Sequence, residues 1–333
     1  MPVRIDPFTD EQARTLINLQ QQYQVWMEAE QELHALPYNL ARKEVKGRFY
    51  LYEVLDRTGN AKSLGPWTEA ADSRMAGYRK AKGAAKERRD TARAQIEVTC
   101  RLYRALRLPM IETTAGEILR EADRRRLLGE RLIVVGTNAV PAYSIEANGF
   151  IRDVPDETLD FDLAWTAETA TDAGRPVWEM LKAVDPTFTV NTERVFQARN
   201  AKAYEVELLA APSRMRTMTR TDRPAPISLP EQEWLLNGRR VDHVLVSRNG
   251  LPVRIVAPDP RWFALHKLWM ADKPTRNPLK KPKDRKQGTA ILDAVVQAMT
   301  HFPLDESFEA ELPTELKPYL TRWRSERRPA QTG

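Results

Sequence analysis

The sequence contains one cysteine, Cys100, and only four histidines. A single cysteine cannot form an intramolecular disulfide bond and is too few for a zinc site built from several cysteines. The histidines lie far apart, without the short spacings of metal-binding motifs; they are His34, His243, His266 and His301. The sequence therefore excludes a disulfide scaffold and argues against a cysteine- or histidine-rich metal site.

Long apolar runs are also missing. No segment approaches the roughly 18 consecutive apolar residues of a membrane span. Residues 1–10 contain acids and a proline where a secretory signal would need an apolar core. These absences predict a cytoplasmic protein that makes no contact with a membrane.

The composition is that of a folded protein, with 42% hydrophobic and 29% charged residues. The 333 residues exceed the roughly 250–300 at which one hydrophobic core stops growing, so we expect two or three domains. Lysine and arginine number 52 against 46 aspartates and glutamates, which gives a net charge of +6. This balance favours polyanionic partners, although the excess is small for the length of the chain.

The first part of the chain is predicted to be helical with one β-hairpin. Helical spacing of apolar residues predicts a helix over residues 9–36, and Thr9 and Gln12 have the pattern of a capping box at its start. A β-rich segment with a turn signal at residues 57–60 predicts a hairpin near residues 47–65.

A long helix with an uneven charge is predicted over residues 68–107. Between Arg74 and Arg107 there are eleven basic residues and three acidic ones. The helix is either a solvated face or a surface for a nucleic-acid backbone, because positive charge binds phosphates without reading sequence. The charge pattern leaves both interpretations open.

The rest of the chain mixes strand and helix signals before a helical end. The predicted strands lie at residues 132–135, 159–165, 204–209, 241–246 and 252–256, and the predicted helices at 114–128 and 177–184. Residues 259–325 are predicted to be helical, with a lysine- and proline-rich interruption at 273–283.

Gly136, Thr137 and Asn138 follow the strand at 132–135 and precede a helical run. Glycine lets the backbone approach a ligand closely, and a hydroxyl group with the amides of a helix start can hold phosphate oxygens. Many tight turns between a strand and a helix look similar, so this turn becomes informative only beside other motifs.

Asp160 and Asp162 form the most informative pair. On a strand, alternation places both on one face, about 7 Å apart, with Phe161 on the other face. Two such carboxylates repel each other unless a cation lies between or beside them. Mg²⁺ suits this position because it takes oxygen ligands and bridges to triphosphates. The alternative is an exposed strand edge, although aspartate is a poor strand former.

A third acid is expected from the strand at 204–209, where Glu205 and Glu207 share one face. A carboxylate from a neighbouring strand would complete a site for two metal ions. One ion would activate an attacking hydroxyl, and the other would neutralise a leaving pyrophosphate.

Three short motifs together carry a resemblance to a known superfamily. The motifs are Gly136-Thr137, Asp160-Phe161-Asp162 and Val206-Glu207-Leu208. They resemble the signature of the DNA polymerase β-type nucleotidyltransferases. The sequence around the glycine is most similar to a bacterial family of nucleotidyltransferase-fold proteins, and more distantly to abortive-infection toxin nucleotidyltransferases. The resemblance covers most of the chain, with specific motifs only in residues 132–210.

The resemblance implies an α+β protein with the polymerase β-type fold, a mixed sheet with flanking helices, plus helical N- and C-terminal regions. It divides the chain into three parts. These are a mainly helical region with the hairpin (1–113), a nucleotidyltransferase catalytic domain (114–258) and a helical C-terminal region (259–333).

The resemblance also implies roles for the acids. Asp160, Asp162 and Glu207 would be the catalytic residues and would bind two Mg²⁺ ions, with Mn²⁺ as an alternative. Glu207 is preferred over Glu205 because it lies between apolar residues, with a proline beyond, as in the family's strand.

Cationic residues of the C-terminal region complete the expected site. Lys267 would reach a β- or γ-phosphate as a point charge. Lys283-Asp284, followed by Gln287, resembles the Lys-Asp element after the catalytic domain in these families. Lys267 and Lys283 therefore join residues 136–138 as expected nucleotide contacts; a solvated basic loop is the alternative.

The implied function is metal-dependent transfer of a nucleoside monophosphate from an NTP, such as ATP, to a hydroxyl acceptor, with release of pyrophosphate. RNA or tRNA is the favoured acceptor because of the basic helix at 74–107. A protein or small-molecule acceptor, or an antitoxin-like protein partner, is the alternative.

Two other functions stay open. One is an RNA-binding protein that keeps the fold without turnover, and the other is a metal-dependent phosphodiesterase. The presence of all three acids argues against the RNA-binding protein without turnover. The Gly136-Thr137 turn argues against the phosphodiesterase, because it is better suited to binding a triphosphate.

Overall fold

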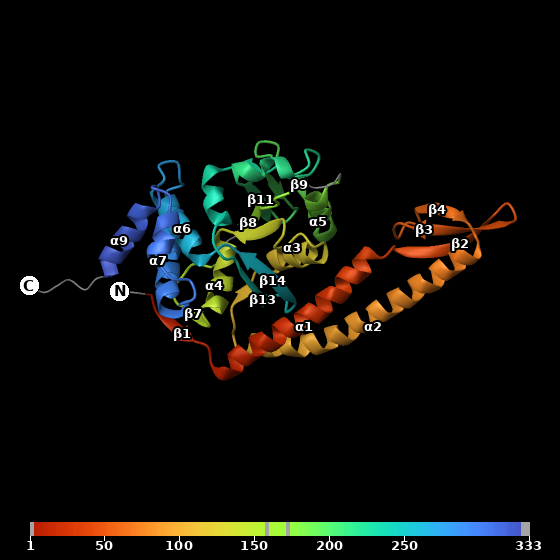
Figure 1. Ribbon diagram of the computed structural model, residues 1–333, viewed down its shortest axis with the longest axis horizontal. Helices are drawn as coiled ribbons and strands as arrows, with labels where there is room; N and C mark the ends of the chain where they lie inside the picture. Colours follow the sequence, from red (N-terminus) through yellow and green to blue (C-terminus); the bar gives the residue numbers. More distant parts are fainter. Residues whose placement is uncertain (1–2, 157–159, 171–173, 328–333) are drawn as a thin grey trace, which may run out of the picture. The chain divides into compact units, whose positions relative to one another are not determined.

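The computed structural model of the chain describes residues 3–156, 160–170 and 174–327 (Figure 1). The chain divides into two compact units: residues 20–99 form the smaller one, and residues 1–19 with 100–333 form the larger. Within the described residues, no helix is long and apolar enough to cross a membrane.

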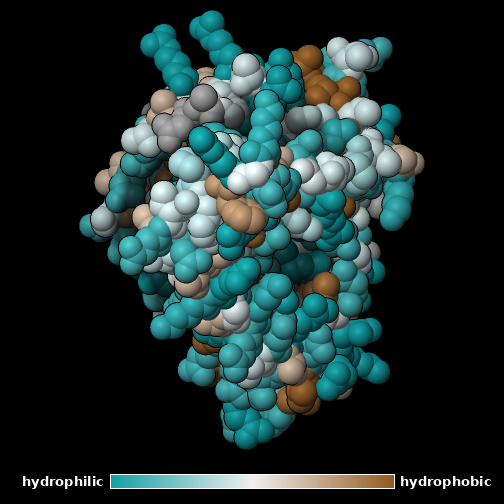
Figure 2. Space-filling model, turned by 90° about the vertical axis from the view of Figure 1, so that its right-hand side faces the viewer, coloured by the Kyte–Doolittle hydropathy of each residue, from teal (hydrophilic) through white to brown (hydrophobic). Residues whose placement is uncertain are grey.

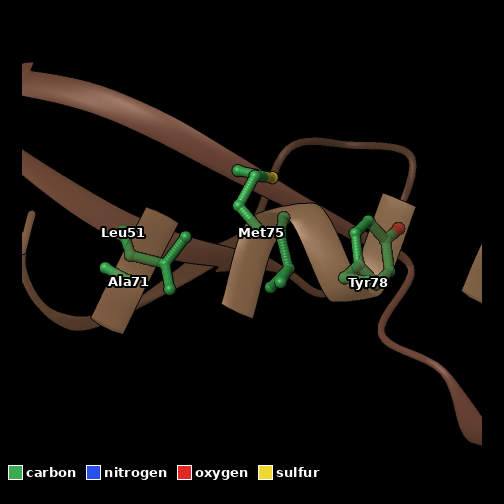
Figure 3. Close-up of a cluster of buried hydrophobic side chains, with 5 residues drawn as sticks. Leu51, Ala71, Met75 and Tyr78 are labelled. Carbon is green, nitrogen blue, oxygen red and sulfur yellow. The ribbon is translucent and has the colours of Figure 1, made fainter. Parts of the chain in front are cut away.

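The smaller unit combines parts of two long helices with an antiparallel sheet. The helices are α1 (Asp10–Ala35) and α2 (Glu69–Ala105), and the strands, in their order of pairing, are β2 (Asn39–Val45), β3 (Arg48–Val54) and β4 (Ala61–Pro66). Leu40 and Leu51 of the sheet form a buried cluster with Ala71, Met75 and Tyr78 of α2 (Figure 3). Burial of these apolar groups holds α2 against one face of the sheet.

The predicted elements of the smaller unit are confirmed, with one strand added. The capping box forms: the Gln12 amide donates to Thr9 Oγ1 at 3.3 Å, and the Thr9 amide donates to Gln12 Oε1 at 2.9 Å. The hairpin forms as β3 and β4. Strand β2 could not be predicted, because residues 41–44 (Ala-Arg-Lys-Glu) contain no β-branched or aromatic residue. It is formed by hydrogen-bonded pairing with β3.

The larger unit contains a six-stranded mixed sheet of order β6-β8-β11-β10-β9, in which β12 also pairs with β11. Its strands are β6 (Leu132–Val135), β8 (Asp160–Trp165), β9 (Thr189–Val190), β10 (Gln197–Arg199), β11 (Glu205–Ala210) and β12 (Ile227–Ser228). Strands β8 and β11 run parallel, whereas β6 is antiparallel to β8 and β10 is antiparallel to β11.

Two smaller sheets and three helices accompany the mixed sheet. The sheets are β14-β13-β5 and β1-β7, formed by β1 (Ile5–Pro7), β5 (Met110–Ile111), β7 (Gly149–Ile151), β13 (Val241–Ser247) and β14 (Pro252–Ala257). The helices are α3 (Thr113–Arg124), α4 (Val140–Glu146) and α5 (Pro176–Val184). Helix α3 packs against β14 and α5, and α4 packs against β13.

The C-terminal part is helical, as predicted. It contains α6 (Pro260–Asp272), α7 (Lys281–Ala298), α8 (Glu306–Glu311) and α9 (Lys317–Arg327). Helices α6 and α7 lie along each other (Figure 1). Gly288 permits this approach, because a Cβ atom there would lie 2.7 Å from the carbonyl oxygen of Ala264.

The predicted α+β class is confirmed, and most predicted elements lie close to their predicted bounds. The helix predicted at 114–128 ends earlier, at Arg124, because Arg126 adopts a left-handed backbone with φ of 57°. The division into three regions stays a prediction; the contacts place residues 114–258 and 259–333 in one compact unit.

Candidate functional site

Four acidic residues lie at neighbouring positions on strands β8 and β11. The strands are parallel, and their register pairs Asp160 with Glu205 and Asp162 with Glu207. The residues between the acids are buried. This alternation matches the sequence prediction; residue 159, the first of that predicted strand, lies outside the described residues.

The two glutamates differ in their partners. Both pair in register with an aspartate, but Arg199 Nε donates to Glu205 at 2.7 Å. Gln197 is 1% exposed, and its amide nitrogen donates to Glu205 at 2.9 Å and to Glu207 at 3.1 Å. Arg199 thus neutralises Glu205, and the role of Glu207 as the third metal ligand stays a prediction.

Burial and like charge raise the pKa values of two of these acids. Burial is the main cause of the raised pKa of Asp162; the charge of Asp160 adds to it, and Lys267 opposes it. Burial is also the main cause for Glu207, followed by the charge of Asp162. Carboxylates that raise one another's pKa form a site that a bound cation would stabilise.

Gly136 lies against Asp162 at the end of β6. Its φ of 71° and ψ of −158° belong to a region that only glycine adopts readily. A Cβ atom at this position would lie 2.1 Å from Asp162 Oδ2. The close contact between the turn and the aspartate strand therefore requires a residue without a side chain.

Thr137 and Asn138 begin a short 3-10 helix, η1 (Thr137–Ala139), that leads into α4. Both residues are 3% exposed. Asn138 Nδ2 donates to the main-chain oxygen of Asp160 at 2.9 Å. Asn138 thus ties the glycine turn to the aspartate strand, and nucleotide binding by Gly136, Thr137 and Asn138 stays a prediction.

Lys280 places a cation beside the acids. Its Nζ lies 2.8 Å from Asp160 Oδ2, and both side chains are partly exposed. The hydrogen bond to Asp160 raises the pKa of Lys280. The two residues are 120 positions apart, so in the sequence Lys280 is only one of several basic residues near α7.

The two lysines expected to contact the nucleotide have other surroundings. Lys267 is 6% exposed, and its Nζ donates at 3.0 Å to the buried carboxylate of Asp284, which also accepts from Arg276 Nε at 2.7 Å. Burial lowers the pKa of Lys283, and the charge of Lys267 adds to this effect. Lys267 therefore belongs to a buried ion-pair cluster, and contact of Lys267 or Lys283 with a phosphate stays a prediction.

The acids offer oxygen donors only, and within the described part of the chain they do not form a complete set of metal ligands. Across residues 3–156, 160–170 and 174–327, no three aspartate, glutamate, histidine or cysteine side chains are positioned to hold a metal ion. Asp160 is instead paired with Lys280. The oxygen-only donors and their raised pKa values fit a hard divalent cation such as Mg²⁺.

The fold and the site define an α+β protein with clustered carboxylates at a glycine turn. A family model described as nucleotidyltransferase matches residues 113–313, which is more than half of the chain. The chain belongs to this nucleotidyltransferase family, and the match includes the glycine turn, the four acids and helices α6 and α7. No curated protein and no solved structure shows significant similarity. The finer resemblance to polymerase β-type enzymes stays a prediction.

Proposed function

We propose that this protein transfers a nucleoside monophosphate from an NTP to a hydroxyl acceptor and releases pyrophosphate. Asp160, Asp162 and Glu207 would bind the required Mg²⁺ or Mn²⁺ ions. The observation that supports this proposal best is the register of β8 and β11, which gathers these acids beside the Gly136 turn in a member of a nucleotidyltransferase family.

Two divalent ions in such a site would neutralise the triphosphate and activate the acceptor hydroxyl. The chain's own groups have supporting tasks. Gln197 holds Glu207 in place, and Asn138 fixes the main chain at Asp160. The Lys280 ammonium group is partly exposed, so we expect it to move from Asp160 to a phosphate oxygen when the nucleotide binds.

The reaction requires no covalent intermediate with the protein. The acceptor oxygen forms a bond to the α-phosphorus, the bond from this phosphorus to the bridging oxygen of the pyrophosphate breaks, and the hydroxyl proton passes to a carboxylate of the site. Catalysis then consists of positioning and charge neutralisation.

We propose RNA, such as tRNA, as the acceptor. Helix α2 presents exposed basic side chains within the smaller unit; these include Arg74, Arg79, Lys80 and Lys86. Some of its other arginines are already paired, as Arg88 is with Glu32 and Arg93 with Glu97. The excess of unneutralised positive charge suits a phosphate backbone.

The test incubates purified protein with Mg²⁺ and each of the four NTPs, labelled with ³²P at the α-phosphate. Total cellular RNA, protein extract and buffer alone serve as acceptors, and Asp160→Asn with Asp162→Asn is the control. The proposal predicts label on RNA that is lost in the control. Label on protein would keep the chemistry and overturn the RNA acceptor, and no label with any acceptor would overturn the proposal.

A further inference from the structure

The sheet of the smaller unit has two chemically different faces. Leu40 and Leu51 point to the face that packs on α2. Directly paired residues of antiparallel strands share a face, so Glu53, the partner of Leu40, lies on this side as well. Glu44 is paired with Phe49, two positions before Leu51, and also lies there. Both acids of the three strands are therefore on the face toward α2.

The opposite face, which we call the open face, differs in its lack of acids, whereas the face toward α2 also carries the cations Arg42, paired with Leu51, and Lys62, paired with Glu53. The central residues of the open face are Lys43, Val45, Arg48, Tyr50 and Tyr52. Lys43, Val45 and Arg48 are exposed, and the two tyrosines are half-buried. The strand residues paired with the tyrosines on β4 are Pro66 and Ser63. The open face thus carries two aromatic rings and two cations, and none of its strand residues is acidic.

Direct contacts show that the cations and the rings share this surface. Lys43 pairs with Tyr50 across the sheet, and Lys43 Nζ lies 5.1 Å from the centre of the Tyr52 ring. The two tyrosines are two residues apart on one strand, so their Cα atoms lie about 7 Å apart, a spacing that lets separate bases stack on the two rings. Arg48 follows the tight turn to β3 and extends the positive charge along the same strand.

We propose that the open face binds single-stranded nucleic acid, with bases stacked on Tyr50 and Tyr52 and phosphates held by Lys43 and Arg48. Aromatic platforms beside cations are the general means of binding single strands. The inference rests on the proposed RNA acceptor and adds the part of the acceptor that is bound: an unpaired segment. The side of the molecule shown in Figure 2 is mostly hydrophilic, with small hydrophobic patches.

The first test measures binding of a short fluorescein-labelled single-stranded RNA to the full chain by fluorescence anisotropy. Replacing each tyrosine by alanine is expected to weaken binding by about 5- to 150-fold. Tyr50→Phe with Tyr52→Phe keeps the rings and is expected to bind as the wild type does. Phe49→Ala is the matched control, because Phe49 is a 41%-exposed aromatic residue of the same strand on the other face. Unchanged binding by the alanine variants would overturn the proposal.

The second test measures the cations through salt dependence. Lys43→Ala with Arg48→Ala removes two charges, so the slope of log affinity against log salt is expected to fall by about 1.4. This pair of variants leaves the rings in place and keeps the proposal testable if the tyrosine variants fold poorly. An unchanged slope would contradict it. Stronger binding of an acidic peptide than of RNA would also overturn the proposal, because that result would assign a protein partner to the open face.

This inference and the proposed function can fail separately. Pyrophosphate release from an NTP with a very short acceptor reports on the chemistry without the open face. If pyrophosphate is released but RNA binding is unchanged by substitution of Tyr50 and Tyr52, only the inference fails. If RNA binding depends on the tyrosines but no NTP is consumed with any acceptor, the proposed function fails.

Discussion

At the scale of single residues, Glu205 and Glu207 illustrate how position separates two identical side chains. They share a strand face and accept hydrogen bonds from the same Gln197. Both pair in register with an aspartate of β8, but only Glu205 accepts a hydrogen bond from Arg199 Nε, whereas burial and the charges of Asp162 and Asp160 raise the pKa of Glu207. Strand alternation leaves both as candidates; the contact with Arg199 distinguishes them.

This difference predicts unequal effects of two matched substitutions. Glu207→Gln is expected to lower kcat/KM for nucleotidyl transfer by at least about 100-fold, because it removes the charge of a proposed metal ligand. Glu205→Gln is expected to change it by only a few-fold. Steady-state kinetics of both variants checks this, and equal losses would contradict the assignment of Glu207.

Gly136 provides a second residue-scale prediction. In Gly136→Ala the new methyl group meets Asp162 Oδ2, and the backbone angles become strained. We expect a loss of about 1–3 kcal/mol in the free energy of unfolding, and a loss of transfer of about 100-fold from the displaced carboxylate.

Gly83→Ala is its control. Gly83 lies within α2, and a Cβ there would meet nothing within 4 Å. The same substitution should therefore stabilise the protein by about 0.4–1 kcal/mol. Urea unfolding of both variants measures the two effects, and a stabilised Gly136→Ala variant would refute the steric argument.

At the scale of elements, local patterns predict most of the fold. Capping, periodicity and turn residues suffice for α1, the β3-β4 hairpin and α2. They do not suffice for β2 or for the two-residue strands β5, β9 and β12, which exist through pairing with neighbours. The same limit holds for the site: strand alternation finds the acids, but Gln197 and Lys280 could not be assigned to them, because only the folded chain brings them together.

A cluster between elements provides a prediction on pH. The carboxylate of Glu146, on α4, lies within hydrogen-bonding distance of His243 on β13 and of His301 after α7, and Arg239 is 3.6 Å away. Burial would raise the pKa of Glu146, but the two histidines outweigh this effect and lower the pKa to about 2. When the pKa of a carboxyl group is lower in the folded than in the unfolded state, its ionised form stabilises the folded protein. This stabilisation is complete at a pH above the unfolded-state pKa, and it is lost as the pH falls toward the folded-state pKa.

Glu146→Gln is therefore expected to lower the free energy of unfolding at neutral pH by about 1–3 kcal/mol. The difference in free energy of unfolding between the variant and the wild type should shrink as the pH falls from about 4.3, the unfolded-state pKa, toward the folded-state pKa. Urea unfolding over a pH series measures this difference. A difference that stays constant down to acid pH would show that the carboxylate charge is not its source.

At the scale of the whole molecule, the chain separates into a unit with the acids and a unit with the open face and the exposed basic residues of α2. Leu19 and Cys100, where the chain passes between the units, are fully buried and belong to the larger one. Gln12 Nε2 also donates to the main-chain oxygen of Leu106 at 3.1 Å within that unit, which ties α1 to the chain just after α2.

Replacing residues 20–99 by a short glycine-serine loop is expected to leave the larger unit folded. The shortened protein should still release pyrophosphate with a short acceptor, but lose affinity for RNA. Thermal unfolding and anisotropy binding measure the two properties. Loss of folding would mean that the larger unit needs the smaller one for its stability. Retained RNA affinity would mean that the RNA-binding surface lies on the larger unit.

The proposed function assigns metal-dependent nucleotidyl transfer to Asp160, Asp162 and Glu207. The most direct measurement follows transfer of ³²P from α-labelled NTP during a Mg²⁺ titration, for the wild type, for Asp160→Asn with Asp162→Asn, and for Glu205→Gln. We expect Mg²⁺-dependent transfer by the wild type and by Glu205→Gln, and none by the double variant. Transfer that persists in the double variant, or in the presence of a strong chelator, would contradict it.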